Sequence, residues 1–460
     1  MQRARTAREA IKVMAELTNK YGYFSEGESF SIVDKNEAWI MEMVGKGTEK
    51  KGSVWVALRV PDGYISGHAN QSRIATFPLN DPENCLYAED VIDFARSKGW
   101  FSGEDSEFSF RDAYCPADFG ALRGCEARVW SAFNILSHGW FTFEETKGNL
   151  VTKDAYSYVD YAMGHNPDNR MPLWIKPAKK VTVKNVADVM RDHYEGTPMD
   201  MTTDIGAGGN ALPYRWRPMD FEYEGKKYTN ERAIATQQTG FWFVGQARGN
   251  YPDVIGGILW FGTDDAATSY VTPIYSNTEK VPECFRQGNG NLLSYSATSS
   301  FWINNRISNA CYRMYNIMAP YVRERIDKFE NEQMEKVHLN DVKALELFKK
   351  SMDSAEKAGK KKSLAYDVMA DTGNSFAAVK RLLTSYSVNT AQDIFKQWQE
   401  LEVTLTVKFI DGNVKAQNSD GSFKHTDFSA GIPDELTQPG YTDTWKEAVV
   451  HFHGDVIEEK

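Results

Sequence analysis

The 460-residue sequence lacks paired cysteines, long apolar runs and an excess of basic charge. Its cysteines number five, and none forms a Cys-x-x-Cys pair, which argues against a disulfide framework or a zinc site and favours buried, reduced thiols. No apolar run approaches the roughly 20 residues that a membrane-spanning helix needs. Lys and Arg number 53 against 63 Asp and Glu, and the resulting net charge of −10 argues against nucleic acid as a partner.

Apolar residues are abundant, since 42% of the chain is hydrophobic and 13% is aromatic. A chain of this length forms one large layered domain or two to three ordinary ones. In the stretch Trp39-Ile40-Met41-Glu42-Met43-Val44, apolar side chains alternate onto both faces of a predicted strand. A sheet that is apolar on both faces must be covered on both sides, so we expect an antiparallel sheet between other layers in an α+β protein.

Two turn signals predict hairpins in this sheet. Residues 34–37 are polar and separate two β-prone runs. The tripeptide Pro61-Asp62-Gly63 would likewise join a strand at residues 54–60 to a strand at residues 64–68.

Helix signals are clear at the N-terminus, where a capping box from Thr6 to Glu9 begins a helix that Gly22 ends. Periodicity predicts further helices at residues 89–98, 121–136, 186–194, 299–336 with a kink or break at Pro320, 342–358, 363–386 and 391–401. The alternating run Val403-Thr404-Leu405-Thr406-Val407 predicts a strand.

The segment 68–74, His-Ala-Asn-Gln-Ser-Arg-Ile, is the strongest candidate for chemistry. The side-chain amide of Asn70 follows a predicted strand, and a rigidly held amide can donate a hydrogen bond to a developing oxyanion. Two plainer interpretations remain open: a polar loop after a hairpin, or a glycosylation sequon at Asn70-Gln71-Ser72. Alternation along an extended segment would point Gln71 away from Asn70, so we expect its removal to have little effect.

Other motifs carry less chemistry. Cys115 is either a thiolate near Asp118 or a structural thiol. His193 and Glu195 do not form a His-Glu-x-x-His metal motif. The pair Asp264-Asp265 favours a turn or cap over an acid–base dyad.

Several strings resemble the secernin-type dipeptidases, the dipeptidase A family of N-terminal-nucleophile hydrolases. The matching strings include Arg5-Thr-Ala-Arg-Glu-Ala10, His68-Ala-Asn-Gln-Ser-Arg-Ile74, Arg191-Asp-His-Tyr-Glu-Gly-Thr-Pro198 followed by Asp200, and Glu231-Arg232 followed by Thr236-Gln-Gln-Thr239. The matches run in order through about the first 260 residues, and we find no strong match in the last fifty.

The resemblance implies a four-layer αββα fold and a cysteine nucleophile that processing exposes at the N-terminus. The resemblance also implies that the free α-amino group of this N-terminal cysteine acts as the base, because a pKa of about 8 lets the amino group accept a proton near neutral pH. By resemblance, Asn70 matches the oxyanion-hole amide and Arg232 an arginine that stabilises the thiolate. His193, Glu195 and Asp200 then hold the substrate amine or shape the cleft, or else only form a hydrogen-bonded turn.

The resemblance also shapes the expected organisation. We expect a hydrolase core at residues 1–290 with a loop-rich insertion around 147–215, a mostly helical region at 291–410 and a polar tail at 411–460. Dipeptides are the expected substrates of a soluble protein that needs no cofactor or metal and binds neither nucleic acid nor membrane. A homo-oligomer is compatible with the sequence, and a secreted or periplasmic location remains open.

One feature departs from the family pattern. The nucleophile of the family precedes the helix that contains the Arg5-Thr-Ala-Arg-Glu-Ala10 string, whereas this sequence begins at that helix with Met1. We therefore expect a dipeptide hydrolase, or the larger part of one, without its nucleophile. The alternative is a non-catalytic fragment or binding module that retains the fold.

This expectation predicts that the purified chain hydrolyses dipeptides no faster than buffer does. The measurement is a steady-state assay of amino acid release from one dipeptide. Turnover that Cys115→Ala abolishes would contradict it and would identify Cys115 as the nucleophile.

Overall fold

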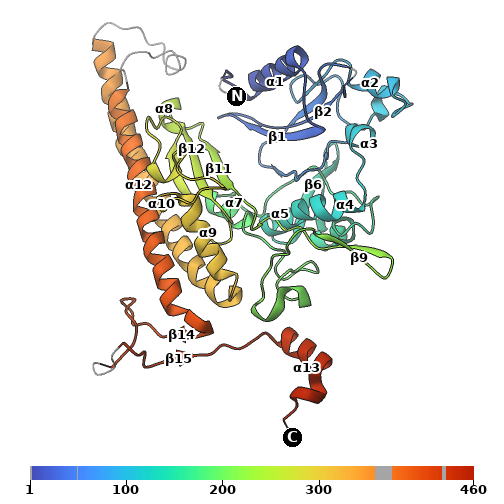
Figure 1. Ribbon diagram of the computed structural model, residues 1–460. Coiled ribbons are helices and arrows are strands. Elements are labelled where there is room, and N and C mark those ends of the chain that lie inside the picture. Colours follow the sequence, from blue (N-terminus) through green and yellow to red (C-terminus); the bar gives the residue numbers. More distant parts are fainter. Residues whose placement is uncertain (1–2, 49, 358–375, 427–430, 460) are drawn as a thin grey trace. The chain divides into compact units, whose positions relative to one another are not determined.

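A computed structural model describes residues 3–48, 50–357, 376–426 and 431–459, and the predicted helix at 363–386 therefore lies partly outside the described residues. The chain divides into two compact units (Figure 1). Unit 1 comprises Met1–Asn185 with Glu231–Ala233, and unit 2 comprises Val186–Asn230 with Ile234–Lys460. Both helices and sheets are present, which confirms the predicted α+β class.

Unit 1 is built around one four-stranded sheet with the order β1-β2-β3-β5. Its elements are α1 (Ala7–Tyr21), β1 (Gly27–Val33), β2 (Ala38–Gly45), β3 (Ser53–Arg59), β4 (Ile65–Ser66), β5 (Cys85–Tyr87), α2 (Val91–Ser97), the 3₁₀ turn η1 (Asp105–Glu107), α3 (Phe110–Tyr114), α4 (Phe119–Ala121), the π-helical turn η2 (Leu122–Glu126), α5 (Ala127–Ser137), β6 (Trp140–Thr146), β7 (Asn149–Asp154), the 3₁₀ turn η3 (Ala155–Tyr158), α6 (Val159–Ala162) and β8 (Trp174–Ile175). The helix α7 (Val183–Val189) leads into unit 2.

The N-terminal helix and the first hairpin form as predicted. Thr6 caps α1 by accepting a hydrogen bond from the backbone N–H of Glu9, and Gly22 ends it at a φ of 94°. Asp34 holds the turn between β1 and β2, because its carboxylate accepts the backbone N–H groups of Asn36 and Glu37. These signals succeed because each is satisfied within a few residues of chain.

The second predicted hairpin is wrong. The turn at Pro61 forms, since the N–H of Tyr64 donates to the Pro61 carbonyl at 3.1 Å. However, β3 pairs with β2 and β5, whereas β4 pairs with β8. A turn signal fixes the local reversal of the chain, but β5 occupies the edge of β3 that β4 would have needed.

Both faces of the sheet are covered, as the alternation of apolar residues predicts. Every residue from Trp39 to Met43 in β2 is buried. The helix α1 covers the Trp39 face, because Arg8 stacks 4.8 Å from the Trp39 ring and Thr18 bonds to Ser53 at 2.9 Å. The opposite face carries Glu42, and the segment 68–74 packs against it.

The stretch from residue 147 onward contains more regular structure than the predicted loop-rich insertion. The strands β6 and β7 form a hairpin, and η3, α6 and β8 follow. Buried aromatic residues, Phe141, Tyr158 and Tyr161, fix this region. Sequence alone favoured loops here because the segment is rich in Tyr, Asn and Pro.

Unit 2 combines a three-stranded sheet, β11-β12-β13, with long helices. Its elements are η4 (Ile205–Asn210), β9 (Asp220–Tyr223), β10 (Lys226–Thr229), β11 (Phe241–Ala247), α8 (Asp253–Gly256), β12 (Gly257–Thr263), β13 (Thr272–Tyr275), η5 (Glu283–Phe285), α9 (Ser300–Cys311), α10 (Tyr315–Lys357), α12 (Ala377–Lys408), η6 (Ile410–Gly412), β14 (Val414–Lys415), β15 (Leu436–Thr437) and α13 (Asp443–Ile457). Figure 1 shows α10 and α12 side by side, and their buried residues form one core with α9.

The predicted strand at residues 403–407 is wrong, because this run forms the last turns of α12. Only Leu405 is buried there, while Val403 and Val407 are exposed. The hydroxyls of Thr404 and Thr406 donate to carbonyls one turn earlier, at 2.9 and 3.0 Å. The alternation of polar and apolar residues therefore does not correspond to a buried strand face here. A helix packed on one side needs only about one buried apolar side chain per turn, and Leu405 supplies it.

Of the predicted kink or break at Pro320, the break is wrong. The break falls at residues 312–314, between α9 and α10, and α10 continues through Pro320. Proline removes one backbone hydrogen bond and its ring crowds the carbonyl four residues earlier, but the buried residues Met318 and Val322 on either side of it hold the helix in the core of unit 2. A kink at Pro320 stays a prediction.

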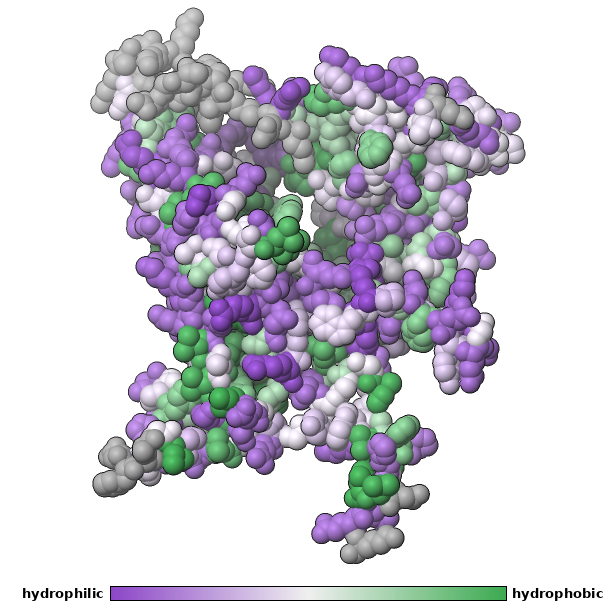
Figure 2. Space-filling model, viewed as in Figure 1, coloured by the Kyte–Doolittle hydropathy of each residue, from purple (hydrophilic) through white to green (hydrophobic). Residues whose placement is uncertain are grey.

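The tail contains a helix that sequence analysis missed. The helix α13 exposes Val450, Phe452, Val456 and Ile457, and Figure 2 shows an apolar patch on it. In the described part of the chain, no helix is long and apolar enough to cross a membrane.

A buried ion pair holds the centre of unit 2. Arg191 Nη2 lies 2.5 Å from Glu330 Oε1, and both side chains are almost fully buried. Arg191 also donates to the carbonyl of Ala266 at 2.9 Å, and Glu330 accepts from the N–H of Val271 at 3.0 Å. The pair thus ties the Arg191 string to the loop after β12 and to α10.

Arg191→Met should lower the free energy of unfolding of unit 2 by about 3–5 kcal/mol, because it leaves the Glu330 carboxylate buried without a counter-charge. The measurement is urea unfolding of the purified chain. Arg286→Met breaks an exposed pair with Glu283 and is the control, which should leave the unfolding midpoint unchanged. Equal midpoints for the two variants would contradict the prediction.

Candidate active site

In unit 1, the carboxylate of Glu42 anchors the segment 68–74. Glu42 is 1% exposed and accepts from the hydroxyl of Ser72, from the N–H of Arg73 at 2.6 Å and from the N–H of Ile74 at 3.2 Å. Burial raises the pKa of Glu42, although these hydrogen bonds and the charge of Arg73 act in the opposite direction. A carboxylate in the middle of β2 therefore docks the second half of the segment onto the sheet.

A second buried charge pair fixes the same segment. Arg73 Nε lies 3.0 Å from Glu126 Oε1, and both side chains are almost fully buried. Arg73 also donates to the carbonyls of Gly67 and Pro172, both at 2.9 Å. Tyr161 donates to Glu126 at 3.1 Å, so the pair is embedded in further hydrogen bonds. Such a network is costly to distort, and it makes the segment a rigid platform.

Asn70 lies at the exposed turn of this platform. Its backbone has a φ of 61°, in the left-handed region that Asn tolerates better than most residues. Arg128 Nη2 donates to Asn70 Oδ1 at 3.0 Å and to the carbonyl of Ala69 at 3.1 Å, and its Nε donates to the carbonyl of Gly124 at 2.9 Å. The segment is therefore held from one side by Arg128 and from the other by Glu42.

The contact with Arg128 fixes the orientation of the Asn70 amide. A guanidinium can only donate, so it must face the amide oxygen and leaves the amide nitrogen directed elsewhere. Among the described residues, none accepts a hydrogen bond from that nitrogen. The result is an exposed, oriented N–H donor on a rigid support.

Gln71 differs from the prediction. It does point away from the exposed side of Asn70, but it is buried and donates to the Cys115 carbonyl at 2.6 Å. Its removal would take away the hydrogen bond to the backbone of half-buried Cys115, so the structure gives Gln71 a structural contact that alternation did not suggest.

Arg232 lies in the short segment of residues 231–233 that belongs to unit 1. Burial raises the pKa of the Cys125 thiol, while Arg128 and Arg232 act to lower it, so both guanidiniums are near this thiol. Arg123 pairs with Glu231 and holds the Arg232 segment in place. Arg128 and Arg232 thus both act on the Cys125 thiol, and Arg128 also contacts Asn70, a contact that sequence reasoning missed because Arg128 belongs to no recognised string.

In unit 2, His193, Glu195 and Asp200 form one compact loop. Glu195 accepts from the backbone N–H of His193 at 2.7 Å, and its Oε1 lies 3.0 Å from His193 Nδ1. Burial raises the pKa of Glu195, but the hydrogen bonds and charge of His193 outweigh it and lower the pKa overall. Asp200 accepts from the N–H of Gly196 at 2.8 Å and from the hydroxyl of Thr202 at 2.6 Å.

The ring of His193 is buried among tyrosines that sequence reasoning did not connect with it. The Tyr214 ring lies 4.9 Å away, edge-on, and the Tyr315 ring lies 6.1 Å away. His193 Nε2 is buried and has no hydrogen-bond partner among the described residues. Tyr214 in turn donates to Asp265 at 2.5 Å, as does Tyr312 at 2.9 Å. The carboxylate of Asp265 thereby fixes the wall against which His193 packs.

Asp264 and Asp265 are both buried. The sequence favoured a turn or cap for this pair and did not predict that the two carboxyl groups would be buried. Asp264 has a φ of 67°, accepts from Asn305 at 3.0 Å and accepts from Ser308 at 2.8 Å. Burial raises the pKa of Asp264 to about 6, and the charge of Asp265 adds to the effect. In the described residues no group of three or more His, Cys, Asp or Glu side chains is arranged to hold a metal ion.

The raised pKa of Asp264 predicts a pH-dependent stability. The folded state binds this proton more tightly than the unfolded state, so the contribution to unfolding free energy is greatest below the ordinary pKa of 3.8 and is lost as pH rises to about 6. Asp264→Asn keeps a residue that tolerates the left-handed backbone but cannot ionise. The stability of the parent relative to the variant should fall by about 2 kcal/mol between about pH 4 and pH 6.5. The measurement is urea unfolding of both proteins across this pH range. Unfolding free energies that change in parallel with pH for the parent and for Asp264→Asn would contradict the prediction.

Comparison with known proteins identifies the family. The sequence profile of peptidase family C69 matches residues 1–328. A probable dipeptidase from Latilactobacillus sakei is 26% identical over 282 residues, which cover 61% of this chain and 50% of the relative. A probable dipeptidase A from Streptococcus pyogenes serotype M3 is 25% identical over 361 residues, or 76% of this chain and 65% of the relative.

Dipeptidase A from Lactobacillus helveticus is 23% identical over 339 residues, which cover 72% of this chain and 59% of the relative. The chain thus spans about half to two thirds of the length of these relatives. Because the profile match covers well over half of the sequence, the chain belongs to peptidase family C69.

Proposed function

We propose that this chain is a cysteine-type dipeptide hydrolase, or the larger part of one, that acts through a thioester. The observation that carries the proposal is the oriented amide of Asn70, exposed on a platform that two buried carboxylates hold rigid. Membership of a peptidase family and the dipeptidase names of the relatives support the same reaction class.

In the proposed mechanism, a thiolate attacks the carbonyl carbon of the dipeptide. The carbonyl oxygen gains negative charge, and the Asn70 N–H donates a hydrogen bond to it. The carbon–nitrogen bond then breaks, and the leaving amine takes the proton that the α-amino base accepted from the thiol. Water hydrolyses the resulting thioester, which releases the second amino acid and restores the thiol. Arg128 does not touch the reacting atoms but positions Asn70 by holding its oxygen. The positive charge of Arg232 stabilises the thiolate before attack, as guanidinium groups do for neighbouring thiolates.

Four thiols of this chain are poor candidates for the nucleophile. Burial raises the pKa of Cys85 and Cys284 to about 12 and raises the pKa of Cys125 and Cys311 as well. These thiols stay protonated near neutral pH, and a thiol attacks far more slowly than a thiolate. The proposed nucleophile remains the N-terminal cysteine of the family pattern.

The loop of His193, Glu195 and Asp200 is the proposed site for the substrate amine. Glu195 is half-exposed and keeps a negative charge near neutral pH because its pKa is lowered. Each carboxylate oxygen has two lone pairs, so Glu195 can accept from an ammonium while it still bonds to His193. A free ammonium is what distinguishes a dipeptide from the interior of a longer chain.

The four-layer αββα arrangement is also a proposal. Unit 1 contributes a sheet covered by α1, and unit 2 contributes a sheet against which α9, α10 and α12 pack. A sheet and a helical layer in each unit are the parts that such a fold requires.

Asn70→Gly tests the proposal in the catalytically active form of the protein. Glycine adopts the left-handed backbone without strain, so the variant loses the amide and keeps the fold. We expect kcat to fall by about 10²–10³ with little change in KM, because the hydrogen bond strengthens only in the transition state. Asn70→Ala should lose the same activity and also about 1 kcal/mol of stability, because alanine resists this φ.

Asn149→Ala is the matched control, since Asn149 is exposed on the β6–β7 hairpin of the same unit. It should retain full activity. Parent-like kcat for Asn70→Gly would remove Asn70 from the site and leave the segment 68–74 as a structural platform.

A further inference from the structure

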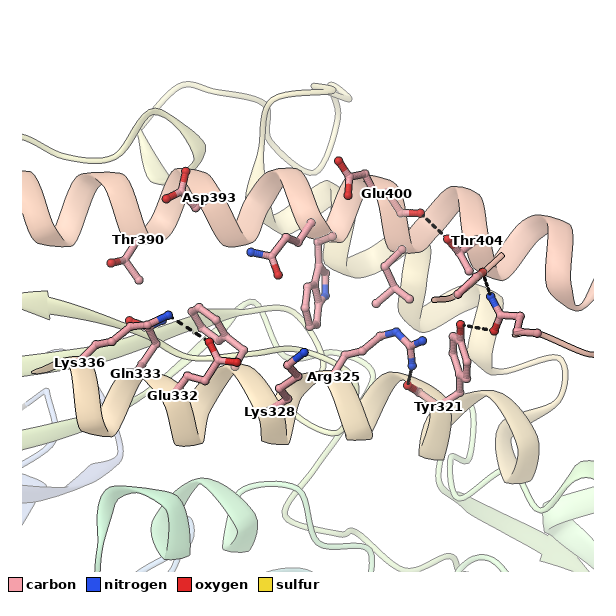
Figure 3. Close-up of a pocket in the computed structure, with 16 residues that line it drawn as sticks. Tyr321, Arg325, Lys328, Glu332, Gln333, Lys336, Thr390, Asp393, Glu400 and Thr404 are labelled. Carbon is pink, nitrogen blue, oxygen red and sulfur yellow. Dashed lines mark hydrogen bonds and ion pairs between the residues drawn. The ribbon is translucent and has the colours of Figure 1, made fainter. Parts of the chain in front are cut away.

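A groove runs between α10 and α12 in unit 2, and none of the residues of the proposed reaction lines it. It has a volume of about 510 Å³, and Figure 3 shows the side chains that line it. The α10 wall includes Tyr321, Arg325 and Lys328, and the α12 wall includes Trp398 and Leu401. The groove therefore combines aromatic and aliphatic surface with charged groups.

Positive charge on the α10 wall is not neutralised within the groove. Glu332 is already paired with Lys336 at 3.0 Å. Arg325 stacks 3.5 Å from the centroid of the Tyr321 ring, and the carboxylate nearest to it, the exposed Glu324, lies 3.9 Å away. Lys328 has no ion-pair partner among the described residues.

Lys408 adds to the positive charge at the Tyr321 end. Its Nζ lies 5.3 Å from the centroid of the same ring. Burial lowers the pKa of Lys408, and the charge of Arg325 lowers it further. The repulsion between Arg325 and Lys408 is relieved when an anion binds.

Trp398 contributes a donor that the protein leaves unused. The side chain is 1% exposed and packs edge-on against Tyr270 at 4.8 Å, so its position is fixed by the core. Its indole N–H is buried and has no hydrogen-bond partner among the described residues. A buried donor without a partner costs about 1–3 kcal/mol, and a ligand that accepts from it recovers part of that cost.

Carboxylates on the other helix limit how much negative charge the groove accepts. Asp393 and Glu400 line it from α12. They would repel a multiply charged anion such as phosphate more strongly than a single carboxylate.

We propose that this groove is a binding site for a small organic monocarboxylate with an aromatic or apolar body. The carboxylate accepts from Arg325, Lys328 and the indole N–H of Trp398. The body packs between Tyr321 on the α10 wall and Leu401 on the α12 wall. The site is separate from the proposed reaction, so its test needs no catalytic activity.

Calorimetric titration of the purified chain with N-acetyl-L-phenylalanine tests the proposal, with N-acetyl-L-phenylalaninamide as the uncharged match. The acid should bind, whereas the amide and inorganic phosphate should not. Lys328→Met keeps the aliphatic stem and should weaken binding about tenfold, because it removes one charge-assisted hydrogen bond. Lys343→Met, an exposed position on the same helix outside the groove, should change affinity by less than about twofold.

Nuclear magnetic resonance locates the ligand independently. The indole N–H resonance of Trp398 is identified by its loss in Trp398→Phe, and it should shift with the acid and stay in place with the amide. Trp398→Phe should also weaken binding of the acid, with a melting curve to establish that the variant is folded. Equal binding of acid and amide, unchanged affinity of Lys328→Met, or an unmoved Trp398 resonance would each overturn the proposal.

Discussion

The carboxylate of Glu42 is the constraint on which the candidate active site depends. It stands in the middle of a strand whose other buried residues are apolar, and within the described part of the chain the groups that donate to it all belong to the segment 68–74. A buried carboxylate must find such donors or destabilise the fold, so the sheet and the segment specify one another. Everything that Asn70 can do follows from this docking, because an amide on a mobile loop would not be held in one orientation.

The same principle explains why the strings that mark the family are so specific. In the string from His68 to Ile74, the last four residues are buried, and Ser72 and Arg73 take part in charge networks. In the string from Arg191 to Pro198, Arg191 pairs with Glu330 and the His193 ring packs against tyrosines. Most of each string is therefore needed for folding, and the exposed parts, Asn70 and Glu195, are the ones available for chemistry.

The cations Arg325 and Lys328 at the α10–α12 groove differ from the buried charges of the two networks above, because they lack a close carboxylate partner in the ranges that the structure describes. The buried charges of Glu42 and Arg191 meet backbone donors or an opposite charge. At the groove, the cations Arg325 and Lys328 line an open space, and the Trp398 indole N–H, which also lines it, has no acceptor among the described residues. A buried donor without an acceptor in an otherwise well-packed region needs an explanation, and a bound ligand that accepts the hydrogen bond is the one we propose for Trp398.

Sequence alone determined the features whose partners lie close along the chain. The cap at Thr6, the stop at Gly22, the turn at Asp34 and the two-sided burial of β2 were all predicted, because local hydrogen bonds and alternation decide them. Sequence and resemblance also nominated Asn70, but its role remains a proposal.

Tertiary structure decided what depends on distant partners. Pairing of β4 with β8 instead of β3, and helix instead of strand at residues 403–407, follow from which surfaces are free and which side chains are buried. The orientation of the Asn70 amide is set by Arg128, which is 58 residues away in sequence, and the wall beside His193 is held by Asp265. Burial and charge pairing join residues far apart in the chain, and no local pattern records those distances.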